Sequence, residues 1–198
     1  MNWDKPNPRI AAHEVDAMFI DRWSPRSFLE KELTDEQIES LFEAARWSPS
    51  CFNDQPWHFR YARSDTDRAL FAEPLVEKNR PWAMRAPLLI YLLARLHFAG
   101  SSKPNRHNSF DAGAAWMSLA LQARRLGLYA HAMAGFDVKK AHEVLNVPED
   151  EYTVMAAIAV GYRGRASLLT EELAAMESPN CRKTYSEVVG EGVVVPKG

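Results

Sequence analysis

The sequence predicts an α+β protein with a mixed central sheet flanked by helices, and three observations support this fold class. First, short β-branched or apolar segments alternate with segments whose apolar residues recur at helical spacing. Second, the continuous apolar run Leu88–Ala94 is typical of a strand covered on both faces. Third, no internal repeat, low-complexity block or long Gly/Ser linker divides the chain. We therefore expect residues 1–198 to form a single domain.

The composition excludes several classes of protein. With 46% hydrophobic and 25% charged residues, the chain resembles a soluble globular protein and not a disordered one. The net charge of −2 gives no overall attraction to nucleic acid or to an anionic membrane. The N-terminus lacks the apolar core of a signal peptide, and no apolar run reaches the roughly 18 residues of a membrane helix. Two cysteines 130 positions apart, Cys51 and Cys181, suit free thiols better than a disulfide scaffold, although a single bridge between them is an alternative. Free thiols are typical of a reducing compartment, so we expect a cytoplasmic location.

The first half of the chain is predicted to begin with two helices. After an irregular lead-in at Pro6 and Pro8, apolar residues three and four positions apart predict a helix over His13–Asp21. Thr34 and Gln37 form a capping box at the start of the second helix, which is expected to end near Pro49. The segments that follow are a strand over His58–Ala62, a mixed helical region over Asp65–Asn79, and breaks at Pro81 and Pro87.

The longest helix is predicted in the second half, over Phe110–Leu126, after a loop over Leu96–Ser109. Apolar side chains surround this helix almost completely, which marks it as central, and Gly127 suits the left-handed position after its end. The remaining predicted segments are an extended piece over Leu128–Met133, a helix from its cap Asp137 to Leu145, a turn at Pro148–Asp150, a strand over Tyr152–Val160, a polar tail from Thr170, and an apolar end at Val193–Val195.

Two basic segments could hold an anion. Arg22-Trp23-Ser24-Pro25-Arg26 offers two guanidinium groups, whose planar forks match a phosphate or a carbonyl edge. A second pair of cations, Arg182 and Lys183, follows Pro179 in a loop. Taken alone, each segment is more often a solvated surface than a binding site.

Two junctions could line a flat ligand. The stretch Ser48-Pro49-Ser50-Cys51-Phe52-Asn53-Asp54-Gln55-Pro56-Trp57 combines short polar side chains with two prolines, which stiffen the backbone. It can be a ligand wall or only a stiff connection between a helix and a strand. At Met133-Ala134-Gly135, backbone N–H groups could face a ligand and the glycine would allow close approach, but glycine is also common there without a ligand.

Several kinds of catalytic site lack support in the sequence. The six histidines form no HxxxH or HxH pair and neither cysteine belongs to a CxxC, so no metal site is expected. The chain has no G-x-S-x-G elbow, no G-x-G-x-x-G and no Walker A loop. We therefore assign no catalytic side chain, and a nucleotide would have to bind without these loops.

Taken in order, these motifs resemble the FMN-dependent nitroreductase family. The resemblance runs from about Asp21 to Glu187. The segments that carry it are Arg22-x-Ser24-x-Arg26-x-Phe28, Ala44-Ala45-Arg46-Trp47-Ser48-Pro49-Ser50-x-x-Asn53-x-Gln55-Pro56-Trp57-x-Phe59, Asp111-x-Gly113-x-Ala115, Gln122-Ala123-x-x-Leu126-Gly127-Leu128, Gly135-Phe136-Asp137, Val147-Pro148 and Gly161-Tyr162. The family implies a nitroreductase-like fold of intertwined homodimers, with two FMN sites at the dimer interface.

The resemblance also implies a set of cofactor-binding residues. The FMN phosphate would be held by Arg22 and Ser24, together with Arg182 and Lys183. Arg26 would reach the N1/O2 edge of the isoalloxazine ring. The ring would be lined by Pro49, Ser50, Cys51 and Asn53 from the other subunit, and by Met133, Ala134 and Gly135, whose backbone N–H groups would lie near N5 and O4. Trp23, Gln55 and Asn79 complete the set of expected contacts, while Cys51 and Asp54 depart from the family pattern.

The activity implied is that of an oxidoreductase that uses bound FMN. It would take hydride from NAD(P)H and reduce a nitroaromatic, quinone or similar electrophilic acceptor by a ping-pong mechanism. A fixed cation such as Arg26 would stabilise the negative charge that reduction builds on the flavin. The alternatives are a reductive dehalogenase, a flavin-fragmenting enzyme, or a flavin-binding protein without turnover, all on the same fold.

Overall fold

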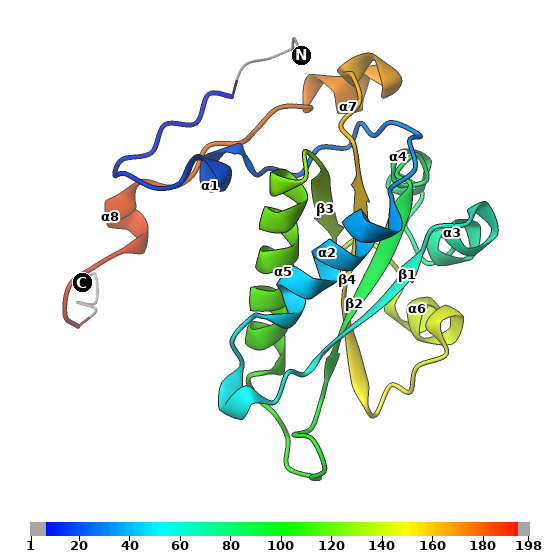
Figure 1. The fold of residues 1–198 in the computed structure, drawn as a ribbon, viewed down its shortest axis with the longest axis vertical. Helices are drawn as coiled ribbons and strands as arrows, with labels where there is room; N and C mark the ends of the chain where they lie inside the picture. The colour runs from blue at the N-terminus through cyan, green and yellow to red at the C-terminus, as the bar shows by residue number, and fades with distance from the viewer. Residues whose placement is uncertain (1–6, 194–198) are drawn as a thin grey trace.

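A four-stranded sheet forms the centre of the computed structural model, which describes residues 7–193 (Figure 1). The strands are β1 (Trp57–Ala62), β2 (Leu88–Arg95), β3 (Tyr129–Met133) and β4 (Tyr152–Gly161), in the spatial order β1-β2-β4-β3. All three strand pairs are antiparallel. The α+β class is confirmed, but the expectation of a mixed sheet is wrong for the described residues. The long helix between β2 and β3 does connect strands of the same direction, but β4 lies between them and is antiparallel to both.

Helices cover both faces of this sheet. They are α1 (Ala17–Asp21), α2 (Asp35–Arg46), α3 (Asp65–Ala72), α4 (Arg80–Ala83), α5 (Asn108–Arg125), α6 (Val138–Leu145), α7 (Glu171–Ala175) and α8 (Tyr185–Val188), with short 3₁₀ turns η1 (Cys51–Asn53) and η2 (Ala166–Leu168). The helices α2 and α5 pack on one face, and α3, α4 and α6 on the other (Figure 1). Alternate residues of β2 therefore enter different cores, Ile90 one and Tyr91 the other, which confirms a strand buried on both faces.

Side-chain caps fix several helix ends, and they explain where the predicted bounds were right or wrong. The capping box of Thr34 and Gln37 and the cap at Asp137 are both confirmed. The first helix begins at Ala17 and not at His13, because the Asp16 side chain accepts a hydrogen bond from the Met18 N–H and caps the helix there.

The break expected at Pro81 does not occur, because Pro81 lies inside the short helix α4. It occupies the second position of α4, where its missing N–H group costs no helical hydrogen bond. The helix α5 begins two residues earlier than predicted, at Asn108, so the loop before it is shorter. That loop is also ordered by a bridge between His97 and Pro104 and by a hydrogen bond from Asn105 N to Leu96 O of 2.8 Å.

The two ends of the described chain lie together, away from the sheet. Figure 1 shows α1 (blue) and α8 (red) beside each other on an extension of the molecule. The Arg9 guanidinium joins them, because it donates to the carbonyl of Asn180 at 2.7 Å. The predicted positions Pro6, Val194 and Val195 lie outside the described residues. Among the residues that the structure describes, no helix combines the length and apolarity needed to cross a membrane.

Candidate functional site

Three arginines from distant parts of the chain gather where the two ends meet. The pKa of Arg22 is lowered, first by burial and then by the positive charges of Arg182 and Arg9. The pKa of Arg9 is lowered in the same way, by burial and by Arg182. Within residues 7–193 the Arg22 side chain forms no hydrogen bond and no ion pair. A partly buried cluster of like charges favours the binding of an anion, which would offset the repulsion.

Arg9 was missed by the sequence analysis, and no local pattern could have found it. Its guanidinium donates to the backbone carbonyls of Ile20 at 3.1 Å, Arg22 at 2.6 Å and Asn180 at 2.7 Å. It therefore binds the segment that carries Arg22 to the segment that carries Arg182, across a separation of 171 positions in the chain. Lys183 is exposed next to Arg182, without an ion pair in the described part of the chain.

The rest of the arginine motif divides between surface and core. Arg26 and Ser24 are half-buried, and their side chains make no hydrogen bond within the described residues, so both are available to a ligand. Trp23 is buried, packs edge-on against Tyr129 at 6.2 Å, and carries Arg163 over its ring. A ligand contact at Trp23 would thus have to come from its backbone.

The turn after β3 presents two free amide groups. Met133 is buried, Ala134 is exposed, and the N–H groups of Ala134 and Gly135 donate to no acceptor in the described residues. The Gly135 carbonyl accepts from Val76 N at 3.1 Å and from Asn79 Nδ2 at 3.2 Å. A Cβ at Gly135 would lie 2.6 Å from Asn79 Nδ2 and 3.0 Å from Val76 Cγ2, so a larger residue here would displace these side chains. Asn79 therefore holds this turn in place.

The predicted wall around residues 49–55 is a strained turn with internal hydrogen bonds. The Gln55 N–H donates to Ser50 Oγ at 3.0 Å, and Gln55 Nε2 donates to the Asn53 carbonyl at 3.0 Å. Phe52, Asn53 and Gln55 have φ angles of 53°, 55° and 48°. Such a conformation costs about 1–3 kcal/mol per residue and is found most often at functional sites. Pro49 and Cys51 belong to the same turn, and the Cys51 N–H donates to the buried Asp111 of α5 at 3.1 Å.

Asp54, which the sequence left unexplained, organises the loop before α5. Its carboxylate accepts from Arg95 Nη2 at 2.9 Å, the Ala99 N–H at 2.8 Å and Asn105 Nδ2 at 2.9 Å. Burial alone would raise the pKa of Asp54, but the hydrogen bonds from Ala99, Arg95 and Asn105 outweigh it and lower the pKa. The residue has a structural role next to the wall.

The predicted site residues form two groups at opposite ends of α5. The strained turn contacts Asp111 in the first turn of this helix. The arginine motif lies near the other end, because its Trp23 packs against Tyr129, which follows the last residue of α5 by four positions. A helix of 18 residues is roughly 27 Å long, so one copy of the chain does not bring both groups to one ligand. The turn at Met133 belongs with the arginine group.

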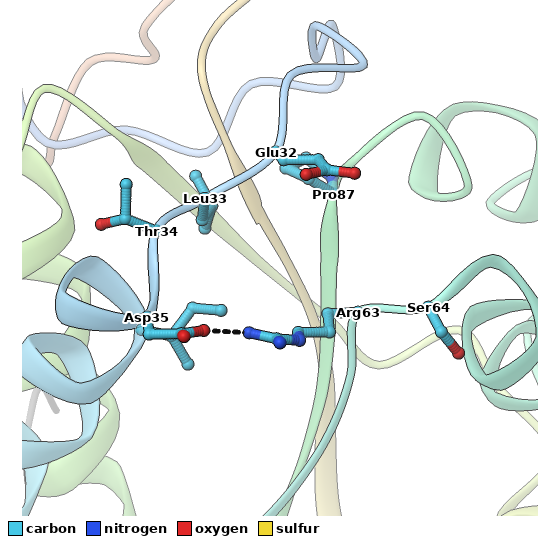
Figure 2. A pocket seen from close by; sticks show the side chains of 8 residues that line it. Glu32, Leu33, Thr34, Asp35, Arg63, Ser64 and Pro87 are labelled. Atoms are coloured by element: carbon cyan, nitrogen blue, oxygen red, sulfur yellow. Dashed lines mark hydrogen bonds and ion pairs between the residues drawn. The ribbon is translucent and has the colours of Figure 1, made fainter.

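The surface of residues 7–193 includes two hollows of several hundred Å³. One, of about 670 Å³, runs between the N-terminal and C-terminal segments and is lined by apolar residues together with Arg9, Arg182 and Lys183. The other, of about 510 Å³, is lined by none of the predicted cofactor-binding residues. Figure 2 shows Asp35 and Arg63 pointing toward each other across it. Among the described residues, no group of three or more His, Cys, Asp or Glu side chains is arranged to hold a metal ion.

Comparison with protein families finds one match over most of the chain. The model of the nitroreductase family matches residues 20–77 and 62–162. Two proteins of Streptomyces coelicolor, both provisionally named NADH dehydrogenase/NAD(P)H nitroreductase, are 30% and 27% identical to this chain. The alignments cover 69% of this chain and 77% of the first relative, and 75% of this chain and 85% of the second.

Solved structures share the same fold. The crystal structure of an oxidoreductase containing FMN superimposes with a TM-score of 0.92 at 39% identity, over 98% of this chain and 99% of that one. A nitroreductase-type protein of Exiguobacterium sibiricum, solved in complex with FMN, superimposes with a TM-score of 0.75 at 16% identity, over 92% of this chain and 99% of that one. At that identity the second likeness concerns the fold alone.

Proposed function

Because this chain belongs to the nitroreductase family, we propose that it is an FMN-dependent oxidoreductase that uses NAD(P)H to reduce a nitroaromatic, quinone or similar electrophilic acceptor. The observation that carries the proposal is the partly buried cluster of Arg22, Arg9 and Arg182, whose like charges favour the binding of an anion. The solved structure at 39% identity contains FMN, whose phosphate is an anion of the kind that this cluster favours.

The residues at hand fit FMN in three respects. Arg22 and Arg182, with Ser24 and Lys183, offer cations and a hydroxyl to a phosphate, and Arg9 adds to their positive field. The Arg26 guanidinium has no hydrogen-bond or ion-pair partner in the described residues and can stabilise negative charge on the N1/O2 edge of a flavin. The free N–H groups of Ala134 and Gly135 can donate to its polar edge.

When bound, FMN supplies a two-electron carrier that accepts hydride from NAD(P)H and then reduces the acceptor, which gives a ping-pong order. The protein's part is to bind, orient and stabilise charge, so we assign no side chain as a general acid or base. The pyridine-nucleotide donor and the free cysteines suit a cytoplasmic location, which stays our expectation.

We also propose that the protein is a single-domain homodimer in which the strained turn of one protomer lines the flavin bound by its partner. The separation of the two residue groups along α5 supports this arrangement. So do large apolar side chains near the strained turn, since Trp47 is 73% and Phe110 80% exposed. The extension formed by α1 and α8 adds a further apolar surface that a second copy could cover.

Absorbance tests the cofactor, and anaerobic mixing tests the reaction. Purified protein should show the flavin bands, or gain them when FMN is added, and NADH or NADPH should bleach them. A protein that stays colourless in the presence of FMN would contradict the proposal. A yellow protein that neither nucleotide bleaches would instead favour a flavin-binding role without turnover. A screen of nitroaromatic, quinone and halogenated acceptors on the reduced protein would then separate nitroreductase from dehalogenase activity.

A further inference from the structure

A buried carboxylate from a remote part of the chain accepts hydrogen bonds from the backbone N–H of Arg26. Glu177, which follows α7, is 2% exposed. Its two oxygens accept from the Arg26 N–H at 3.1 and 3.0 Å, and one of them also accepts from the Ser27 N–H at 2.9 Å. A buried carboxylate is costly unless it is hydrogen-bonded, so these contacts are a stable arrangement of the fold.

The opposite side of the same peptide unit is held by a histidine. His131 Nδ1 of β3 lies 2.9 Å from the Pro25 carbonyl oxygen. A carbonyl only accepts, so Nδ1 must carry the proton. Burial lowers the pKa of His131 to about 4, opposed by the bond to Pro25 and assisted by the charge of Arg26, so the ring is neutral near pH 7. In a trans peptide the C=O and N–H groups point in opposite directions, and here each has a side-chain partner.

Nothing in the described residues holds the guanidinium of Arg26, although its backbone is fixed on both sides. Glu177 also leads into the segment of Asn180 and Arg182, which Arg9 joins to Arg22. One carboxylate thus links the backbone of Arg26 to the segment that carries part of the cation cluster. A fixed backbone limits where the guanidinium can lie, which is what electrostatic stabilisation of a ligand requires.

We propose that Glu177 and His131 are positioning residues, which clamp the Pro25–Arg26 peptide so that the Arg26 guanidinium favours the reduced form of bound FMN. This inference rests on the proposed function. It predicts that weakening the clamp lowers the two-electron midpoint potential of the flavin, because reduced FMN loses a stabilising cation. A Glu177 that acted only through its negative charge would have the opposite effect, since removing that charge raises the potential.

The test compares full-length, FMN-loaded variants by the midpoint potential of the flavin and by FMN affinity. Glu177→Gln and His131→Leu should each reduce the preference for reduced FMN about tenfold, equivalent to a fall of about 30 mV. His131→Asn should retain most of the wild-type potential, because its amide N–H can still donate to Pro25. Glu172→Gln, the same change at an exposed position of α7, is the matched control and should leave the potential unchanged.

A double-mutant cycle with Arg26→Ala separates positioning from general damage. Without the guanidinium, Glu177→Gln should lower the potential no further. A rise in potential on Glu177→Gln, or an equal fall with and without Arg26, would overturn the inference. If wild-type protein binds FMN but Glu177→Gln and His131→Leu both keep the wild-type potential, this inference is overturned and the proposed function is not. Wild-type protein that fails to bind FMN would overturn the proposed function, and this inference with it.

Discussion

At the scale of single residues, the fold gives each arginine of the motif a different environment. Arg22 lies in a cluster of like charges, whereas Arg26 stands on a clamped backbone with a free side chain. Ser24 is available between them, while Trp23 is committed to the core. The motif was predicted as one binding segment, and the structure places its residues in distinct environments.

Alanine substitutions should therefore separate binding from reduction. Arg22→Ala should weaken FMN binding at least about tenfold, the loss expected for a charge-assisted hydrogen bond, with a smaller effect on flavin reduction. Arg26→Ala should slow reduction by NAD(P)H about a hundredfold and weaken binding less. Fluorescence titration and anaerobic stopped-flow measurements give the two quantities, with Arg60→Ala as the control at an exposed arginine of β1, at the opposite edge of the sheet from β3. Equal effects of both variants on both quantities would contradict this division.

The half-buried His131 predicts how stability depends on pH. Its folded-state pKa of about 4 lies below its ordinary value of 6.5, so the unfolded chain binds more protons between these two pH values. The free energy of unfolding should therefore fall as the pH is lowered from 6.5 to about 4, by at most roughly 3 kcal/mol from this residue. Denaturant unfolding of the apoprotein should show a smaller fall in His131→Asn. Identical pH profiles for the two proteins would refute the shift.

At the scale of elements, hydrogen bonds to Asp54 connect the strained turn to the loop before α5. Its carboxylate joins Arg95 at the end of β2 to Ala99 and Asn105 in the loop. The strained turn next to it has three non-glycine residues with positive φ, which other contacts must hold in place. The starts of α2 and α6 were predicted correctly at their capping residues, whereas α1 begins four residues later than predicted and α5, which has no side-chain cap, begins two residues earlier.

Asp54→Asn should loosen this loop. Loss of the charge and of one acceptor should destabilise the protein by about 1–3 kcal/mol and speed proteolysis within residues 96–107. The lowered pKa of Asp54 means that its contribution is present above about pH 4 and is lost as the pH falls through the folded-state pKa. The difference in the free energy of unfolding between wild type and Asp54→Asn should therefore become smaller in acid. Asp150→Asn, at an exposed turn, is the control, and an equal loss in both variants would argue against the assigned role.

At the scale of the whole molecule, the two groups of site residues require a second copy if they are to serve one ligand. The length of α5 separates them, and the apolar side chain of Phe110 near its start is left exposed. The charge and composition of the chain give no sign of this arrangement.

Phe110→Glu should therefore weaken the dimer and the retention of FMN together. Glutamate is tolerated in the first turn of a helix, so the fold itself should persist. Light scattering at several concentrations and the flavin content of the purified protein report the two effects. The matched change Leu70→Glu, at a partly exposed position of α3, should affect neither. A stable monomer that retains FMN at wild-type levels would rule out the shared site.

The sequence by itself determined the features that depend on near neighbours. The capping box at Thr34, the cap at Asp137, the doubly buried β2 and the collinear motifs of the family all follow from spacing and periodicity over a few residues. Only the tertiary structure brought Arg9 to Arg22 and Arg182, placed β4 between β2 and β3, and closed Glu177 and His131 on one peptide unit. Those contacts join residues as many as 171 positions apart, and their geometry is fixed by packing of the whole chain, which no local pattern encodes.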